Sequence, residues 1–129
     1  MSRAILDTSV FIARDQGRPL ARALPEDVAV SVVSIAELEV GVLIAQDAQT
    51  RGQRLRTLTQ VRTLAGALPI DERTASAHAQ LAVGVLSDGR KPRVHDTWIA
   101  ATALVNDAEV WTQDNDFSDF ATAVTVVRV

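Results

Sequence analysis

Five acidic residues stand where short apolar runs give way to polar turns or to helical patterns. They are Asp7, Glu37, Asp96, Asp114 and Asp116. In an open parallel sheet, ligands bind beyond the carboxyl ends of the strands, where loops lead into helices. Carboxylates gathered there would repel one another, and their pKa values would rise unless a cation neutralised them. Mg²⁺ and Mn²⁺ prefer carboxylate and water oxygen, so the pattern predicts a site for one or two such ions.

Each acid also has an ordinary structural explanation. Ser34 and Glu37 have the spacing of a capping box, in which the two side chains satisfy free amides at the start of a helix. Asp96 could cap a helix, and the remaining acids could form turns. Asp71 also follows a predicted strand, and we assign it no function. Position alone therefore does not separate a site from a cap.

The neighbours of the acids favour a site. Asp7 lies between two apolar segments, Ile5–Leu6 and Val10–Ile12. Asp96 shares a helix face with apolar residues three, four and seven positions further on, which directs its carboxylate toward the core. Surface caps do not usually have such neighbours.

The elements that must position these acids alternate between β-branched runs and longer helical stretches, which is typical of an α/β domain with a mainly parallel sheet. Strands are expected at Arg3–Leu6, Val28–Val33, Ala67–Ile70, Glu109–Thr112 and Val124–Arg128. Helices are expected at Ser9–Arg14, Leu20–Leu24, Ile35–Asp47, Gly52–Leu64, Glu72–Leu86 and His95–Asn106, with a turn at Phe117–Phe120. No linker or repeat interrupts the pattern, so we expect a single domain over residues 1–129.

Composition excludes several kinds of protein. The 129 residues are 47% hydrophobic and include no Cys, which rules out a disulfide framework, a thiolate metal site and a cysteine nucleophile. No apolar stretch approaches the roughly 20 residues of a membrane helix, so we expect no membrane partner and a cytoplasmic location.

The formal net charge of -3 argues against a broad cationic surface for nucleic acid. An anionic substrate would therefore have to be attracted by local groups of basic residues. The candidates are Arg14, Arg18 and Arg22 in the N-terminal part, and Arg90, Lys91 and Arg93 before the Asp96 helix.

Four ordered segments resemble the PIN domain, and specifically the VapC-type toxin ribonucleases of bacterial toxin–antitoxin pairs. They are Leu6–Ile12, Ser34–Gly41, Arg93–Ala101 and Thr112–Phe117, and the match spans almost the whole chain. The resemblance implies a three-layer α/β/α fold whose parallel five-stranded sheet has the order 3-2-1-4-5. It would place the first and fourth strands side by side, and Asp71 at the sheet edge.

The resemblance also implies roles for individual residues. Asp7, Glu37, Asp96 and Asp114 match the acidic quartet, Asp116 matches a fifth acid that some members add, and Thr8 and Thr112 match hydroxyl positions bordering the site. All five acids are then both catalytic residues and metal ligands. His95 departs from the pattern, because Asn is more usual there, and as the neighbour of Asp96 on a helix it need not face the metal.

The activity implied is that of a Mg²⁺- or Mn²⁺-dependent endoribonuclease. A metal-activated water would cleave RNA, with structured RNA such as tRNA or rRNA among the candidate substrates, to leave a 5′-phosphate and a 3′-hydroxyl. The implied partners are a VapB-type antitoxin and a second copy of the chain. Val40, Leu43 and Ile44, outside the expected core face of their helix, are a candidate seam for that homodimer.

Three other classes of function stay open as alternatives. A haloacid-dehalogenase-like phosphatase needs a second Asp two positions after Asp7, where this chain has Ser9. A phosphoacceptor receiver domain could use Asp71, but the later Lys that it requires is absent. A non-catalytic α/β binding module is disfavoured because every acidic position of the family pattern is filled.

Overall fold

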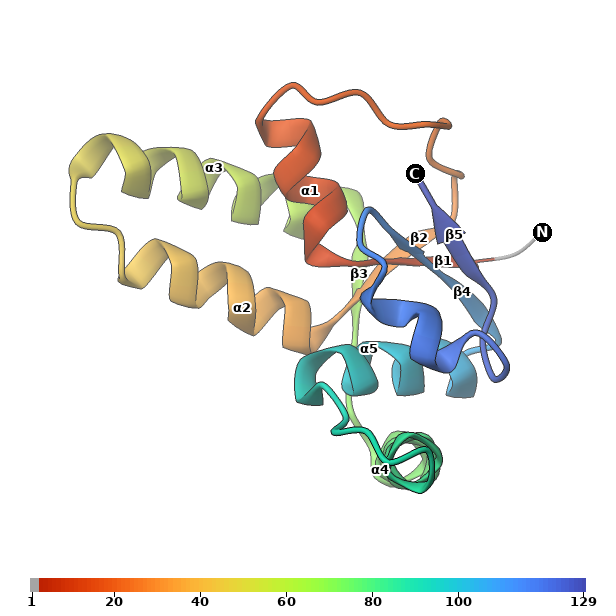
Figure 1. Ribbon diagram of the computed structural model, residues 1–129. Coiled ribbons are helices and arrows are strands. Elements are labelled where there is room, and N and C mark those ends of the chain that lie inside the picture. Colours follow the sequence, from red (N-terminus) through yellow and green to blue (C-terminus); the bar gives the residue numbers. More distant parts are fainter. Residues whose placement is uncertain (1–2) are drawn as a thin grey trace.

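The computed structural model describes residues 3–129, which form one five-stranded sheet with helices on both faces (Figure 1). The strands are β1 (Arg3–Leu6), β2 (Val28–Ser31), β3 (Gly66–Leu68), β4 (Ala108–Thr112) and β5 (Val126–Arg128). Every pairing is parallel, and the order is β3-β2-β1-β4-β5. The predicted order is confirmed, with β1 between β2 and β4.

The helices form two layers. They are α1 (Thr8–Asp15), α2 (Val32–Leu43), α3 (Ala48–Leu64), α4 (Glu72–Ser87) and α5 (Val94–Val105), with a short 3-10 helix η1 (Asp116–Phe120). Helices α4 and α5 cover one face of the sheet, whereas α1, α2 and α3 lie on the other side, with the α2–α3 hairpin extending beyond the sheet (Figure 1). This arrangement confirms the predicted three-layer α/β/α fold.

The central strand β1 shows why the sheet is covered on both faces. Successive side chains of a strand point to opposite faces. Ile5 packs into the core on the α4–α5 side with Ile99 and Phe117, while Ala4 and Leu6 pack into the core on the α1–α3 side. All three β1 residues are fully buried, as the continuous apolar run predicts.

The helix expected at Leu20–Leu24 is wrong. Residues 20–27 have no helix or strand, and Pro19 and Pro25 bracket the segment. Five residues cannot offset the cost of starting a helix, and a proline after them prevents its extension. Leu20 and Leu24 still pack against the core on the α1–α3 side, which explains their apolar character.

The capping box expected at Ser34 and Glu37 is also wrong. Helix α2 begins at Val32, and its N-cap is Ser31, whose Oγ accepts the backbone N–H of Val33 at 3.1 Å. Ser34 is fully buried inside the first turn, and its Oγ has no hydrogen-bond partner among residues 3–129. The expected strand Val28–Val33 is correspondingly shorter. Glu37 lies in the second turn of α2 and has no capping role.

The different roles of the two serines can be measured. We expect Ser31→Ala to lower the free energy of unfolding by about 1 kcal/mol, because an N–H at the start of α2 loses its partner. Ser34→Ala removes a buried hydroxyl without a partner and should leave the free energy of unfolding unchanged or raise it. Urea unfolding of both variants provides the comparison, and a larger loss for Ser34→Ala would contradict this assignment of the cap.

In the part of the chain that the structure describes, no helix has the length and apolar character needed to cross a membrane.

Candidate active site

The carboxyl ends of β1 and β4 bring Asp7 and Thr112 together. Leu6 pairs with Trp111 in the sheet, and the backbone N–H of Asp7 donates to the carbonyl oxygen of Trp111 at 2.9 Å. Asp7 occupies the N-cap position of α1, but its side chain makes no capping hydrogen bond. The Asp7 side chain is therefore free for another role, although the residue is only 5% exposed.

Two hydroxyl groups fix the carboxylate of Asp7. Ser9 Oγ donates to Asp7 Oδ2 at 2.7 Å, and Thr112 Oγ1 donates to the same oxygen at 3.0 Å. The hydroxyls in turn accept the backbone N–H groups of Gln113 and Asp114, at 3.1 and 3.0 Å. Because both hydroxyls bond Oδ2, the carboxylate has a defined orientation, and Oδ1 has no hydroxyl donor among residues 3–129.

Asp96 lies in the first turn of α5, within electrostatic reach of the other acids. Burial, followed by repulsion from Asp7, Asp116 and Glu37, raises the pKa of Asp96 to about 6, against an opposing effect of Arg93. A pKa raised by several carboxylates at once shows that the negative charges converge on this residue.

Glu37 and Asp114 show the same behaviour. Burial raises the pKa of Asp114, and the charges of Asp7 and Asp116 raise it further. Burial also raises the pKa of Glu37, with His95 opposing the shift and Asp7 adding to it. The fold thus brings together all five acids that the sequence predicts for the site.

The aspartates that cap helices have lowered pKa values, in contrast to the raised values of Glu37, Asp96 and Asp114. The backbone N–H of Thr50 lowers the pKa of Asp47, and the backbone N–H of Thr74 lowers that of Asp71. Asp71 is the N-cap of α4 and follows the edge strand β3, as expected. The raised pKa values of Glu37, Asp96 and Asp114 therefore separate these three acids from the helix caps Asp47 and Asp71.

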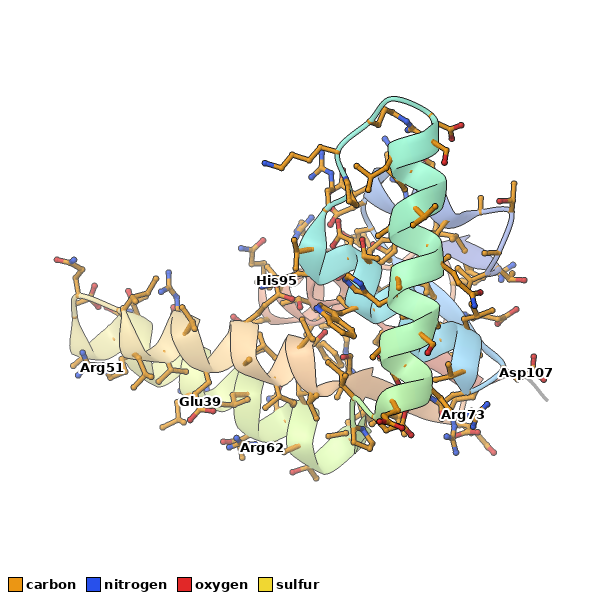
Figure 2. All side chains as sticks on the ribbon, turned by 90° about the horizontal axis from the view of Figure 1, so that it is seen from below. Glu39, Arg51, Arg62, Arg73, His95 and Asp107 are labelled. Carbon is orange, nitrogen blue, oxygen red and sulfur yellow. The ribbon has the colours of Figure 1, made fainter. Side chains whose placement is uncertain are left out.

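Glu37 has a partner that the sequence did not indicate. His95 lies at the start of α5 and is labelled in Figure 2. Its Nδ1 lies 3.7 Å from Glu37 Oε2, which joins α5 to α2. The residues are 58 positions apart in the printed sequence, and no local pattern relates them. His95 therefore faces the acidic site despite its departure from the family pattern.

Asp116 has a cationic partner of its own. It begins η1, and its Oδ2 lies 3.2 Å from Arg93 Nη1. One open depression of about 410 Å³ is lined by Glu37, Arg93, Val94, His95, Asp96 and Asp116. The side of the acid cluster formed by α2, α5 and η1 is thus accessible from outside.

The basic residues predicted to bind RNA lie in different surroundings. Arg18 Nη1 donates to Gln113 Oε1 at 3.1 Å, next to Asp114. Arg14 lines a separate depression with Phe11 and residues of α3, and Arg22 lies over the ring of Trp111 at 5.6 Å. Arg93 therefore borders the acids directly, whereas Arg14 and Arg22 point elsewhere.

Thr8 borders the site from α1. Its Oγ1 is buried and has no hydrogen-bond partner among the described residues. Thr8 and Glu37 both line a cleft of about 610 Å³ between α1, α2 and α3. An unpartnered hydroxyl beside Asp7 is a further oxygen ligand available at this edge of the sheet.

The donor set fits a hard divalent cation. The five acids offer carboxylate oxygens, and the mutual repulsion seen in the raised pKa values is what a cation would relieve. Within residues 3–129, however, no three Asp, Glu or His side chains are arranged so that they could hold a metal ion as they stand. The residues therefore supply the ligands for an ion without forming a finished cage.

The raised pKa of Asp96 leads to a prediction for metal-free protein. The ordinary value is 3.8 and the folded-state value about 6, so the folded state holds this proton more tightly than the unfolded state does. The resulting stabilisation is complete at low pH and is lost as the pH rises through about 6. We expect Asp96→Asn, which stays uncharged, to have a higher Tm than the wild type at about pH 7 and the same Tm near pH 4.

Thermal melts in EDTA and in Mg²⁺ would check this expectation. Mg²⁺ should raise the Tm of the wild type at neutral pH more than that of Asp96→Asn, because it offsets the same repulsion. Identical melting curves for the two proteins at both pH values would contradict the proposed charge crowding.

The comparisons with known proteins agree with this geometry. The PIN domain family model matches residues 4–123. The chain is 46% identical to Ribonuclease VapC5 of Mycobacterium tuberculosis over 97% of this chain and 94% of that protein. The crystal structure of VapBC-5 from Mycobacterium tuberculosis, a member of the VapBC family of toxin–antitoxin systems, matches with a TM-score of 0.85 and 41% identity, covering 100% of both chains. FitAcB from Neisseria gonorrhoeae matches with a TM-score of 0.76 and 29% identity, covering 96% of each chain.

A parallel 3-2-1-4-5 sheet with acids gathered at its carboxyl edge is the architecture of a PIN-type nuclease. The chain belongs to the PIN domain family, and within it to the VapC-type toxin ribonucleases.

Proposed function

We propose that the chain, as a single PIN-like domain over residues 1–129, is a Mg²⁺-dependent endoribonuclease and the toxin of a type II toxin–antitoxin pair. The observation that supports this most directly is the buried carboxylate of Asp7, held by two hydroxyls amid acids whose pKa values are raised. Mn²⁺ has the same ligand preference and is the alternative ion, and the site offers enough carboxylates for one or two ions.

The residues would divide the work of holding the cation. Asp7 and Asp96 are the proposed direct ligands. Glu37, Asp114 and Asp116 would bind through water or hold a second ion, with Thr8 and Thr112 as supporting hydroxyls. Ser9 and Thr112 orient Asp7 through hydrogen bonds, and His95 lies 3.7 Å from Glu37. When bound, Mg²⁺ supplies Lewis acidity that activates a water molecule and offsets charge on the phosphate oxygens.

The proposed reaction is hydrolysis of a phosphodiester bond. The oxygen of water forms a bond to phosphorus, and the bond from phosphorus to the 3′-oxygen breaks. The departing 3′-oxygen takes up a proton, so that one fragment ends in a 3′-hydroxyl and the other begins with a 5′-phosphate. The acids would hold the reacting phosphate at the open depression next to Asp96 and Glu37.

A nuclease fits the site better than a phosphatase of the haloacid-dehalogenase type. Such a phosphatase needs a second carboxylate two positions after Asp7. That position is Ser9, whose hydroxyl donates to Asp7 instead.

RNA, including tRNA or rRNA, is the proposed substrate, which would place the protein in the cytoplasm. Arg14, Arg18, Arg90, Lys91 and Arg93 are the proposed RNA-binding residues.

A VapB-type antitoxin is the proposed protein partner. The cleft of about 610 Å³ between α1, α2 and α3 reaches Glu37 and Thr8, so that a bound segment would lie against the acids. Gly41 and Ile44 line the same cleft, which gives it an apolar wall. A basic side chain on the inserted segment would complement the carboxylates.

A homodimer is also proposed. Val40, Leu43 and Ile44 are 54%, 72% and 65% exposed at the end of α2, where three large apolar side chains meet solvent. A second copy packing there would bury this surface. Sedimentation of the isolated chain as a monomer at micromolar concentration would contradict the dimer.

The nuclease proposal is tested with labelled RNA. The purified chain should cut it in Mg²⁺, stop in EDTA, and leave fragments that a 5′-phosphate-dependent exonuclease degrades. The same preparation should not hydrolyse p-nitrophenyl phosphate. Cleavage that continues in EDTA, or fragments with 5′-hydroxyl ends, would overturn the proposed mechanism.

A further inference from the structure

The loop between α4 and α5 builds a second polar depression beside the acids. Its volume is about 320 Å³, and its lining includes Arg90, Lys91 and Arg93 together with Asp116, Asp119 and Ser118. Arg93 and Asp116 also line the acidic depression. The two depressions therefore share a wall, and one surface continues from Glu37 and Asp96 to Lys91.

The loop has a defined shape. Helix α4 ends in a Schellman motif, with the N–H of Arg90 donating to the carbonyl of Val85 at 3.2 Å and that of Gly89 to Leu86 at 2.9 Å. Gly89 has a φ of +75°, the left-handed conformation that this ending requires and that other residues rarely adopt. The path of the backbone toward Lys91 is therefore set.

Ion pairs then orient the two arginines of the loop. Arg90 pairs with Asp119 of η1, and Arg93 pairs with Asp116 at 3.2 Å. A guanidinium group has five N–H donors, so each arginine keeps donors for a further acceptor. Lys91 is exposed, and within residues 3–129 no carboxylate lies within 4.0 Å of its ammonium group. Arg90 also lies 3.6 Å from Asp88, so three cations face three carboxylates here, and Lys91 is the cation left without a paired carboxylate among residues 3–129.

We propose that this loop is a phosphate subsite that holds the RNA backbone next to the bond that is cut. The inference rests on the proposed nuclease function, and it assigns the binding of flanking phosphate to Arg90, Lys91 and Arg93. Carboxylates at the reaction centre repel RNA, so cationic side chains next to the centre are needed to hold the strand. Arg14, by contrast, lies in a depression that contains none of the five acids.

Lys91 provides the sharpest test because its replacement breaks no ion pair seen in residues 3–129. Binding is measured by fluorescence anisotropy with a labelled single-stranded RNA of about 12 nucleotides, a length within the usual range for such sites. All chains include Asp7→Asn, so that the RNA stays intact. We expect Lys91→Gln to raise the Kd about five- to tenfold and to reduce the slope of log Kd against log salt by about 1.

Two further variants serve as controls. Lys91→Arg keeps the charge and should retain the affinity within about twofold. Arg56→Gln removes the same charge from an exposed position on α3, outside both depressions, and should leave Kd and salt slope unchanged. Equal losses in Arg56→Gln and Lys91→Gln would show a general charge effect and would overturn the subsite.

Modified RNA locates the contact on the strand. An uncharged methylphosphonate replaces one phosphate at a time. Replacement at one position near the cleaved bond should weaken RNA binding by the protein that retains Lys91, but not by Lys91→Gln. Equal responses of both proteins at every position would refute the inference. It would also be refuted if Lys91→Gln bound RNA normally and lost affinity only for an acidic peptide measured in the same way. If the wild type fails to cut RNA in Mg²⁺, the nuclease proposal fails, and the Kd comparison remains interpretable.

Discussion

Asp7→Asn should lower the rate of RNA cleavage about a thousandfold or more while leaving the fold intact. The amide has nearly the shape of the carboxylate, and its oxygen can still accept the hydroxyls of Ser9 and Thr112. The lost negative charge, however, is the one nearest the centre of the cluster, since Asp7 contributes to the raised pKa values of Glu37, Asp96 and Asp114. Several kcal/mol of charge stabilisation by a metal correspond to such a loss of rate.

Asp71→Asn is the matched control for this substitution. Asp71 also follows a strand and precedes a helix, but its carboxylate caps α4 by accepting the N–H of Thr74 at 3.0 Å. Asn caps helices about as well as Asp, so this variant should cleave RNA at the wild-type rate. Single-turnover cleavage and thermal melts of both variants provide the measurement. A folded Asp7→Asn that cleaves at the wild-type rate would eliminate the proposed role of Asp7.

Thr112→Val should reduce cleavage about 10- to 100-fold, a typical result when a residue that orients a metal ligand is lost. Thr112 is fully buried; its hydroxyl donates to Asp7 and accepts the N–H of Asp114. Valine has a similar shape but leaves both groups without this partner, which should also cost about 1–3 kcal/mol in the free energy of unfolding.

Two variants distinguish positioning from simple destabilisation. Thr112→Ser restores the hydroxyl and should recover most of the activity. Thr102→Val changes a fully buried threonine of α5 whose hydroxyl donates only to a carbonyl of its own helix, at 2.8 Å, and should retain cleavage. Titration of Mg²⁺ in the cleavage assay should show that Thr112→Ser reaches half-maximal cleavage at a lower Mg²⁺ concentration than Thr112→Val. An unchanged Mg²⁺ dependence in Thr112→Val would argue against positioning of Asp7.

The strands and the acids could be predicted because their signals are local. Buried parallel strands are continuous apolar runs, and β1 was predicted with its observed bounds, Arg3–Leu6. The sheet order followed from the family resemblance rather than from any periodicity. The failures arose where two local rules compete. Leu20 and Leu24 have helical character but lie between prolines, and Ser34 has the spacing of a cap although Ser31 is the residue that caps the helix.

The sequence by itself determined the chemistry available to this protein: carboxylates and hydroxyls at strand ends, and no cysteine or phosphate-binding loop. Only the tertiary structure decided which groups meet. Thr112 bonds Asp7 across 105 positions, and Glu37 faces His95, because parallel register aligns the ends of β1 and β4 and the layers set α2 against α5. It also separated the basic residues, placing Arg93 against the acids and Arg14 away from them. Residue type and spacing report local environment, whereas contacts between distant segments depend on strand order and register.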